Sequence, residues 1–311
     1  MNNIIIFDSK VADRIFAKLS NFYSHDSVMA WKNKLNKDIN ELFEKYKIIQ
    51  YALNDKSYMG IVLECESSTY GEIIIKIVPP MINRYKTEVE TLKKLPKELT
   101  CKIHETDFNK SAIVMERILP GNLVEYDSNE ETMFKLFNVL YNNKIEIDET
   151  INKKFKDFKE IVEHDYLICK QKENSNIVDI LYESFKIKYN ELCSDKNNYL
   201  LHGDIYKNNI LLSNSGLKII DPLGFKAPFV MELVSICAYE IFNSFENDNY
   251  NLIVNKYIEF FKDYVDEITY RKALFCQLVK VFIPSIFEAN DNGVRAKKWL
   301  DIIKKLYPEE L

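Results

Sequence analysis

Strand-forming and helix-forming patterns occupy different parts of this chain, and that separation limits the folds open to it. Short runs rich in isoleucine and valine predict strands over 48–53, 60–66, 72–78 and 112–116. Helices are predicted beside these strands, over 27–46 and about 84–95. Further helices are predicted through the rest of the chain, with one short β interruption at 209–220, over 130–143, 152–170, 177–194, 230–245, 250–264, 270–290 and 294–306. We therefore expect an α+β protein of two lobes. Residues 1–116 would hold a small antiparallel sheet with one major helix, and residues 117–311 a larger, mainly helical lobe.

Charge and hydropathy exclude several classes of protein. The 311 residues carry a net charge of −5 and a sequence pI of about 5.6, so no general affinity for nucleic acid or an anionic membrane is expected. No run approaches the ~18–20 apolar residues that span a bilayer. The run Ile4–Phe7 is shorter than the core of a signal peptide and is followed by Asp8. The sequence predicts a soluble, cytoplasmic enzyme or binding protein.

Glycine and cysteine usage narrow the chemistry further. Only seven glycines occur, which excludes a GxGxxG dinucleotide fingerprint and a GxxxxGK[ST] P-loop. The six cysteines are dispersed without a CxxC pair, which indicates buried reduced thiols and argues against disulfides and zinc.

The stretch 201–224 carries the densest group of polar side chains. It reads LHGDIYKNNILL, then SNSG, then LKIIDPLG, and the two apolar runs around the polar turn predict an antiparallel hairpin. In the register set by this turn, Asn209 faces Ile220. Asn209 and Asp221 therefore lie together at the open end of the hairpin, and Asp204 precedes them on a loop.

This group of side chains suits phosphoryl transfer. Mg²⁺ prefers oxygen ligands, and Asn209 and Asp221 can supply the protein's share. Asp204 would then be free to accept the proton of an acceptor hydroxyl. The spacing D-x-x-x-x-N followed by a later metal-binding Asp is that of protein-kinase catalytic loops. An isolated DxxxxN is more often a surface turn, but the preceding HG and the hairpin to IID make the pattern more specific.

Such a site also needs a lysine on a strand, held by a helix carboxylate, to grip the nucleotide phosphates. Lys76 in EIIIKIV shares a strand face with Ile74 by two-residue alternation. On the following helix, helical spacing places Glu88 on the buried face and Glu90 away from it. Glu88 is thus the expected partner of Lys76, although each residue alone is more often a solvated surface group.

The order IIIKI, TEVETL, IVMERILPG, LLHGDIYKNNILL and KIIDPLG resembles the aminoglycoside phosphotransferase family, which has a protein-kinase-like fold. Within that family the chain is most similar to the branch of streptomycin 6-kinases and hydroxyurea-resistance kinases. The phrases ERILPG and DPLG carry that closer resemblance. The resemblance covers about Gly60 to Tyr239.

The resemblance implies a role for each matching position. Asp204 is the catalytic base, Asn209 and Asp221 are Mg²⁺ ligands, Lys76 is the phosphate anchor and Glu88 orients it. Further implied roles are adenine contacts by the backbone of Glu116, Arg117 and Ile118, and structural support of the catalytic loop by His202 and Glu232.

Two regions match the family less well. The loop at 56–60, in the place of the phosphate-covering loop, has one glycine, and Ser57 or a backbone amide there is expected to contact phosphate. The family's acceptor region corresponds to the end of the helix at 270–290, where Glu288 and Asp291 are candidates for binding an amine or guanidine.

We therefore expect a phosphotransferase that uses ATP and Mg²⁺, with GTP as the open alternative nucleotide. Its acceptor would be a hydroxyl of a small polar molecule, an aminoglycoside antibiotic such as streptomycin being the first choice and antibiotic resistance the associated role. One alternative is a metabolic kinase of an amino alcohol or a sugar. Another is a nucleotide-binding pseudokinase that regulates a partner, against which the retained catalytic residues argue. The oligomeric state is left open.

Overall fold

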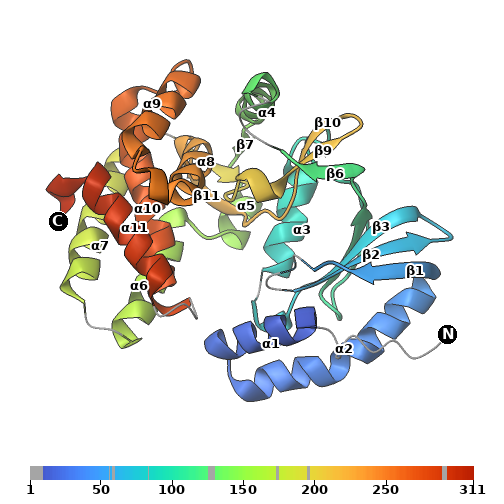
Figure 1. Ribbon diagram of the computed structural model, residues 1–311. Coiled ribbons are helices and arrows are strands. Elements are labelled where there is room, and N and C mark those ends of the chain that lie inside the picture. Colours follow the sequence, from blue (N-terminus) through green and yellow to red (C-terminus); the bar gives the residue numbers. More distant parts are fainter. Residues whose placement is uncertain are drawn as a thin grey trace. The chain divides into compact units, whose positions relative to one another are not determined.

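The computed structural model describes residues 10–55, 57, 60–82, 84–124, 130–172, 175–194, 197–288 and 293–311. The chain forms two compact units, each described by itself below (Figure 1). The first unit comprises Met1–Lys93, Lys97–Asn122 and Leu212–Lys218, and the second comprises Lys94–Pro96, Leu123–Leu211 and Ile219–Leu311. Among the described residues, no helix combines the length and apolarity that crossing a membrane requires.

In the part of the first unit that the structure describes, there are a five-stranded antiparallel sheet and three α-helices. The strand order is β1-β2-β3-β5-β4, with bounds β1 Ile48–Leu53, β2 Ile61–Ser67, β3 Gly71–Ile77, β4 Ile103–Asp107 and β5 Ala112–Glu116. The helices are α1 (Lys10–Phe22), α2 (His25–Lys45) and α3 (Tyr85–Lys94), and a 3₁₀ turn, η1, covers Pro80–Ile82.

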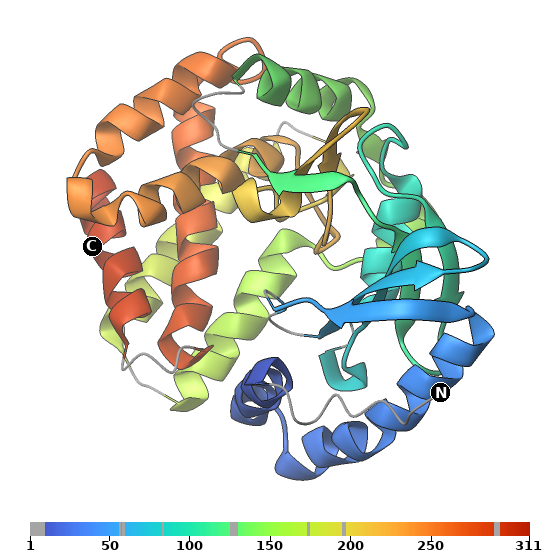
Figure 2. The same ribbon diagram turned by 45° about the vertical axis from the view of Figure 1, so that its right-hand side comes forward.

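Helices α1 and α2 lie along one face of this sheet (Figures 1 and 2). On β3, Ile73, Ile75 and Ile77 are fully buried in the same core as apolar residues of both helices. Side chains alternate along a strand, so Lys76 lies on the opposite face of β3. The α-helical pair therefore covers one face of the sheet, and the other face carries the lysine.

The first unit also includes the tip of a hairpin from later in the chain. Strands β9 (Ile210–Ser213) and β10 (Gly216–Ile219) form a three-stranded sheet with β6 (Pro120–Leu123), in the order β10-β9-β6. Within the first unit, the Asn214 N–H donates to the Leu119 carbonyl oxygen at 3.0 Å. The Lys218 ammonium donates to the Thr100 carbonyl oxygen at 3.1 Å. These bonds explain why this unit extends past residue 116 and gains a segment that the sequence pattern assigned to the second lobe.

The second unit is mainly helical. Its helices are α4 (Glu130–Asn142), α5 (Glu149–Lys154), α6 (Phe158–Lys172), α7 (Asn176–Ser194), α8 (Val230–Asn243), α9 (Tyr250–Phe261), α10 (Glu267–Glu288) and α11 (Val294–Leu306), with 3₁₀ turns η3 (Lys207–Asn209), η4 (Phe245–Asn247) and η5 (Pro308–Glu310). A small antiparallel sheet has the order β11-β8-β7, with bounds β7 Ile145–Glu146, β8 Asn198–Leu201 and β11 Phe225–Pro228.

Helix α10 forms the centre of the second unit. It packs against α6, α7, α8 and α11, and it runs beside α11 in both views (Figures 1 and 2). All residues from Ala273 to Val279 are fully buried, as expected for a helix surrounded by other helices, and Gln277 is the polar residue among them.

The structure contains several elements that the sequence pattern did not predict. These are helix α1 and strands β4, β6, β7, β8 and β11. The helix expected over 152–170 is interrupted, because Phe155 adopts an extended backbone after α5. The Asp157 carboxylate then accepts a hydrogen bond from the Lys159 N–H at 2.9 Å, which begins α6 as a separate helix.

Candidate active site

In the first unit, the structure brings Lys76 and Glu88 together. The Lys76 Nζ lies 2.6 Å from the Glu88 Oε1, and the two side chains are 16% and 1% exposed. The pair exists because β3 turns Lys76 away from the isoleucine core, whereas α3 turns Glu88 inward with Tyr85 and Leu92. A buried carboxylate needs a cation nearby, and Lys76 supplies it. The ammonium is thereby fixed at one place on the sheet, as a phosphate anchor must be.

Ser57, the expected phosphate contact, lies on the connection between β1 and β2. The residue is 7% exposed, and its Oγ is buried without a hydrogen-bond partner among the described residues. Its carbonyl oxygen accepts a hydrogen bond at 3.0 Å from Arg14, on α1. The side-chain oxygen therefore retains its capacity to bond a ligand.

The segment expected to meet adenine follows β5. The Glu116 N–H donates to the Lys102 carbonyl oxygen at 2.8 Å, and the Arg117 N–H donates to Glu72 at 3.2 Å. The Arg117 guanidinium pairs with the Glu72 carboxylate at 2.8 Å. These contacts commit both residues to the sheet and leave the Ile118 N–H as the better candidate for a base contact.

The chain bends sharply directly after Ile118. Gly121 has a φ of +72°, and a Cβ there would lie 2.6 Å from the Ile118 carbonyl oxygen. Only glycine fits such a close approach at a positive φ. This accounts for the glycine in the ERILPG phrase.

In the second unit, Asp204 and Asn209 are directly bonded. The Asn209 Nδ2 donates to the Asp204 backbone carbonyl oxygen at 2.9 Å and to its carboxylate at 3.1 Å. The asparagine is 6% exposed, so its orientation is fixed by burial as well as by these bonds. Because the amide nitrogen faces Asp204, the amide oxygen is the atom left to bind a cation.

The hairpin register places Asp221 next to Asn209. The Ile220 N–H donates to the Asn209 carbonyl oxygen at 3.0 Å, as expected for the predicted pairing. Asp221 follows with a φ of +62°, a left-handed conformation that costs free energy for a residue other than glycine. Strained backbone of this kind is concentrated at functional sites.

Both ring nitrogens of His202 form hydrogen bonds that hold the loop carrying Asp204. It is 1% exposed, and its Nε2 lies 3.0 Å from the Ile220 carbonyl oxygen. The Asp204 N–H donates to its Nδ1 at 3.3 Å. Nδ1 must therefore be the unprotonated nitrogen and Nε2 the donor, so the ring is neutral and links Asp204 to the strand that leads to Asp221.

A hydrogen bond between Gly203 and Glu232 also holds the loop that carries Asp204. The Gly203 N–H donates to both carboxyl oxygens of Glu232, at 3.2 and 3.1 Å. Gly203 has a φ of +80°, and a Cβ would lie 2.3 Å from the Phe225 ring. Complete burial raises the pKa of Glu232 to about 8, and the nearby Asp204 charge adds to the shift. Both residues therefore hold the loop that carries Asp204 through its backbone.

Sequence reasoning missed Tyr206, which lies between the two halves of the DxxxxN motif. Burial first, and then the Asp204 and Asp221 carboxylates, raise the pKa of Tyr206 to about 12. The phenol therefore lies close to both carboxylates. Its ring stacks on Tyr239 of α8, with centroids 4.2 Å apart and planes at 23°. An aromatic residue inside the motif was the available sequence signal.

The two expected acceptor contacts are not placed by the structure. Asp291 lies outside the described residues. Glu288 is the last residue of α10, and only its backbone is described.

Asn209 and Asp221 fit a divalent cation by donor chemistry. They offer an amide oxygen and a carboxylate, the hard oxygen ligands that Mg²⁺ prefers when nucleotide phosphates supply the rest. No histidine or thiol belongs to this pair, so the donor set favours Mg²⁺ over zinc.

Comparison with known proteins identifies the fold. No family model matches the sequence, and no curated protein does. Among solved structures, an ethanolamine kinase from Plasmodium vivax matches with a TM-score of 0.64 at 12% identity, covering 99% of this chain and 98% of its own. The choline kinase LicA from Streptococcus pneumoniae matches with a TM-score of 0.65 at 13% identity, over 88% of this chain and 98% of its own.

A thermostable mutant of the aminoglycoside phosphotransferase APH(4)-Ia matches with a TM-score of 0.61 at 12% identity, over 86% of this chain and 98% of its own. LicA has also been solved with AMP, and an APH(4)-Ia mutant with ADP and hygromycin B. At these identities the likeness establishes the fold. The chain therefore has the α+β protein-kinase-like fold of choline kinases and aminoglycoside phosphotransferases.

Proposed function

We propose that this protein is a Mg²⁺-dependent phosphotransferase that moves the γ-phosphate of ATP to a hydroxyl group of a small amine. The observation that carries the proposal is the contact between Asn209 and Asp204, with Asp221 next to Asn209 in a strained conformation. A surface turn has no need of a buried asparagine that bonds both the backbone and the carboxylate of the same aspartate.

Each side chain has a distinct role in this proposal. Asp204 orients the acceptor hydroxyl and accepts its proton, as a general base. Lys76, oriented by Glu88, binds the α- and β-phosphates. Asn209 and Asp221 would hold Mg²⁺, which supplies neutralisation of phosphate charge when bound. Ser57 and the Ile118 N–H are the proposed contacts of phosphate and adenine, and GTP is the alternative nucleotide.

An aminoglycoside is one acceptor class that the fold neighbours support, since one of them was solved with hygromycin B. Streptomycin is the named candidate from the sequence motifs. Glu288 and Asp291 are the proposed contacts of its amino or guanidino groups, because carboxylates bind such cations directly. If this acceptor is correct, expression of the protein in the cytoplasm of an antibiotic-sensitive bacterium confers resistance to the antibiotic.

An amino alcohol is the second candidate acceptor, and one observation favours it. Tyr206 and Tyr239 form a partly exposed aromatic stack next to Asp204. Aromatic faces attract alkylated ammonium groups. A choline-like or ethanolamine-like molecule could place its ammonium against this stack and its hydroxyl near Asp204.

An ADP-release assay on a panel of hydroxylated amines tests the proposal. The panel contains streptomycin, hygromycin B, choline, ethanolamine and a neutral sugar as control. We expect ADP release that depends on one of the amines and on Mg²⁺, with the product verified by mass spectrometry. Mg·ATP binding without phosphorylation of any acceptor would instead favour a regulatory pseudokinase.

A Tyr239→Leu variant separates the two acceptor classes. If the acceptor is an amino alcohol, loss of the aromatic stack raises the acceptor KM by about tenfold and leaves the ATP KM unchanged. If the acceptor is an aminoglycoside held by carboxylates, the acceptor KM changes little.

A further inference from the structure

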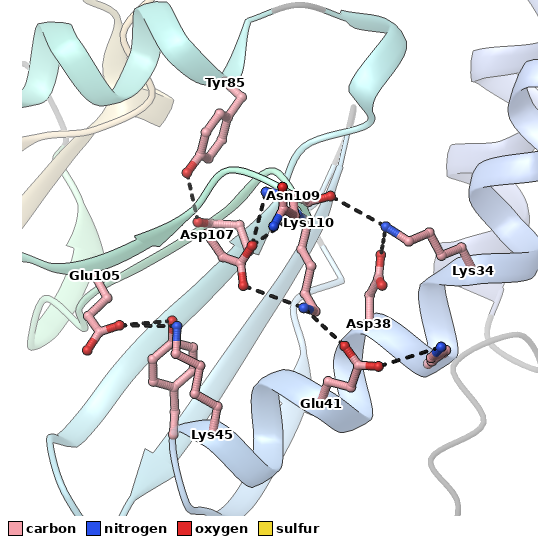
Figure 3. Close-up of polar contacts among 12 residues, drawn as sticks. Lys34, Asp38, Glu41, Lys45, Tyr85, Glu105, Asp107, Asn109 and Lys110 are labelled. Carbon is pink, nitrogen blue, oxygen red and sulfur yellow. Dashed lines mark hydrogen bonds and ion pairs between the residues drawn. The ribbon is translucent and has the colours of Figure 1, made fainter.

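The face of α2 that points away from the core is bonded to the turn between β4 and β5 (Figure 3). The Lys110 ammonium of that turn lies 3.0 Å from a Glu41 carboxylate oxygen on α2. The same ammonium lies 3.5 Å from Asp107, at the end of β4. From α2, the Lys34 ammonium donates to the Asn109 carbonyl oxygen at 3.4 Å. Two side chains of one helix thus hold a single four-residue turn.

A second contact joins α2 to β4 itself. Glu105 on β4 lies 3.3 Å from the Lys45 ammonium, at the end of α2 (Figure 3). The Tyr70 hydroxyl donates to the same carboxylate at 3.0 Å. Helix α2 is therefore bonded to the β4–β5 hairpin at two places, the turn and strand β4.

The turn is in contact with the start of α3. Tyr85, in the first turn of α3 and 5% exposed, donates its hydroxyl to the Ala112 carbonyl oxygen at 3.1 Å. Its ring packs edge-on against Phe108, with centroids 5.6 Å apart. Ala112 is the first residue after the turn, so the position of the turn sets the position of the α3 N-terminus.

These contacts connect the β4–β5 turn to both members of the Lys76–Glu88 ion pair, which lies on the other face of the sheet. Glu88 lies one helical turn after Tyr85 on α3. Lys76 is the cross-strand neighbour of Ile113, the residue that follows Ala112 on β5. A displacement of the turn would therefore move the glutamate and the lysine relative to each other.

Helix α1 holds the other connection that the proposed function uses. The Arg14 guanidinium donates to the Asp55 carbonyl oxygen at 2.5 Å and to the Ser57 carbonyl oxygen at 3.0 Å. Both acceptors lie on the connection between β1 and β2. One guanidinium bridging two carbonyl groups fixes the backbone that presents the Ser57 hydroxyl.

We propose that α1 and α2 form a positioning element for the nucleotide-binding side chains of the first unit, and this rests on the proposed function. Helix α2 fixes the β4–β5 turn and thereby the geometry of the Lys76–Glu88 pair, and Arg14 fixes the β1–β2 connection. Arg14, Glu41 and Lys110 are thus positioning residues that contact no substrate.

If the ion pairs between α2 and the β4–β5 turn only stabilised the fold, their removal would have a different effect. Ion pairs with exposed members contribute little to global stability, and Glu41 is about half exposed. If these pairs only stabilised the fold, their loss would have a small, uniform effect. If they position α3, their loss changes local opening of α3 and nucleotide affinity while the global unfolding free energy stays nearly constant.

A charge exchange between α2 and the turn tests the first contact. Glu41→Lys and Lys110→Glu each place like charges opposite one another, and the double variant restores an opposite pair. We expect each single variant to speed amide hydrogen exchange in α3 by about threefold to tenfold and to raise the Kd of Mg·ATP by a similar factor. The double variant should recover both quantities.

The matched control is Lys37→Glu. Lys37 lies one turn before Glu41 on α2 and pairs with it at 3.8 Å, but its partner is on the same helix. This variant should leave α3 exchange and Mg·ATP affinity unchanged. The inference is overturned if α3 exchanges at the wild-type rate in both single variants, or if Lys37→Glu has an equal effect.

The exchange measurement also separates this inference from the proposed function. Failure of the wild-type protein to bind Mg·ATP would contradict the proposed function, whereas faster α3 exchange in the single variants would still demonstrate positioning by α2. Normal Mg·ATP binding with unchanged α3 exchange would contradict the inference alone.

Arg14→Ala tests the second contact, with Arg14→Lys as the conservative variant and Lys10→Ala as the control on the same helix. We expect Arg14→Ala to raise the ATP KM by about threefold to tenfold without changing kcat or the acceptor KM, because only backbone bonds on the β1–β2 connection are lost. Arg14→Lys should recover part of the loss. Equal changes in kcat, or an equal effect of Lys10→Ala, would overturn the assignment.

Discussion

Among the residues that the structure describes, each unit has one buried glutamate in the first turn of a helix, and the two glutamates are held in opposite ways. Glu88 on α3 is 1% exposed and lies 2.6 Å from the Lys76 ammonium. Glu232 on α8 is 2% exposed and accepts the Gly203 N–H at 3.1 and 3.2 Å. One carboxylate is bonded to a cation, and the other to the backbone.

The difference indicates what each glutamate does. Glu88 bonds an ammonium group, which is a group that can itself bind phosphate. Glu232 orients the loop that carries Asp204, and burial shifts its pKa upward to about 8. The first unit thus contributes a charge to the proposed chemistry, whereas the second contributes a rigid backbone around a carboxylate.

We expect the largest effect from a substitution of Asp204, which lies on the loop that Glu232 supports. Asp204→Asn keeps the shape of the side chain but cannot accept a proton, and we expect turnover to fall by about 10²- to 10⁴-fold with Mg·ATP affinity retained. Steady-state kinetics and calorimetry measure the two quantities. Asp204 is not the base if the variant turns over at the wild-type rate.

The next largest effect concerns the charge pair of the first unit. Lys76→Met removes the cation from a buried glutamate and should destabilise the protein by about 3–5 kcal/mol, because the carboxylate is left uncompensated. The double variant Lys76→Met/Glu88→Leu should recover most of this stability without recovering Mg·ATP affinity. Urea denaturation and calorimetry measure stability and affinity.

Recovery of nucleotide binding in the double variant would contradict a phosphate role for Lys76. Equal stability of the single variant and the wild type would show that the pair is not buried in solution.

The smallest effect is the part of the pH dependence of stability that belongs to Glu232. Its folded pKa of about 8 lies above the ordinary value of 4.5, so the folded state retains a proton that the unfolded state has lost. Its contribution to stability is therefore full below pH 4.5 and disappears as the pH rises through 8, by on the order of a few kcal/mol. Glu232→Gln should abolish this part of the dependence.

Urea denaturation of the wild type and of Glu232→Gln across that pH range measures the difference. Parallel stability curves for the two proteins would mean that the pKa of Glu232 is not raised in the folded state.

Much of the first unit could be predicted because its strands are short, apolar and bounded by turns. Strands β1 and β5 have the predicted bounds, and the choice of Glu88 over Glu90 as the partner of Lys76 followed from the buried stripe of α3. Helix α1 was missed although a local signal was present, because its buried residues Ala12, Ile15, Phe16 and Leu19 recur at helical spacing. Contacts between distant segments, such as Arg14 with Ser57, have no local signal.

In the second unit, the hairpin register gave the proximity of Asn209 and Asp221, since pairing and turn length are local properties. The neutral form of His202 and the raised pKa of Glu232 depend on burial by other segments, which sequence spacing does not reveal. Tyr206 was missed for the same reason, because it lies on a loop and its partner Tyr239 is on helix α8.

The most direct test of the central claim is the calorimetric titration of ATP into the wild type and Asp221→Ala, each with and without Mg²⁺. We predict that the wild type binds ATP much more tightly with Mg²⁺ present, and that Asp221→Ala loses this dependence and at least about tenfold in affinity. Equal ATP affinity of both proteins, with or without Mg²⁺, would contradict a metal-nucleotide site at Asn209 and Asp221.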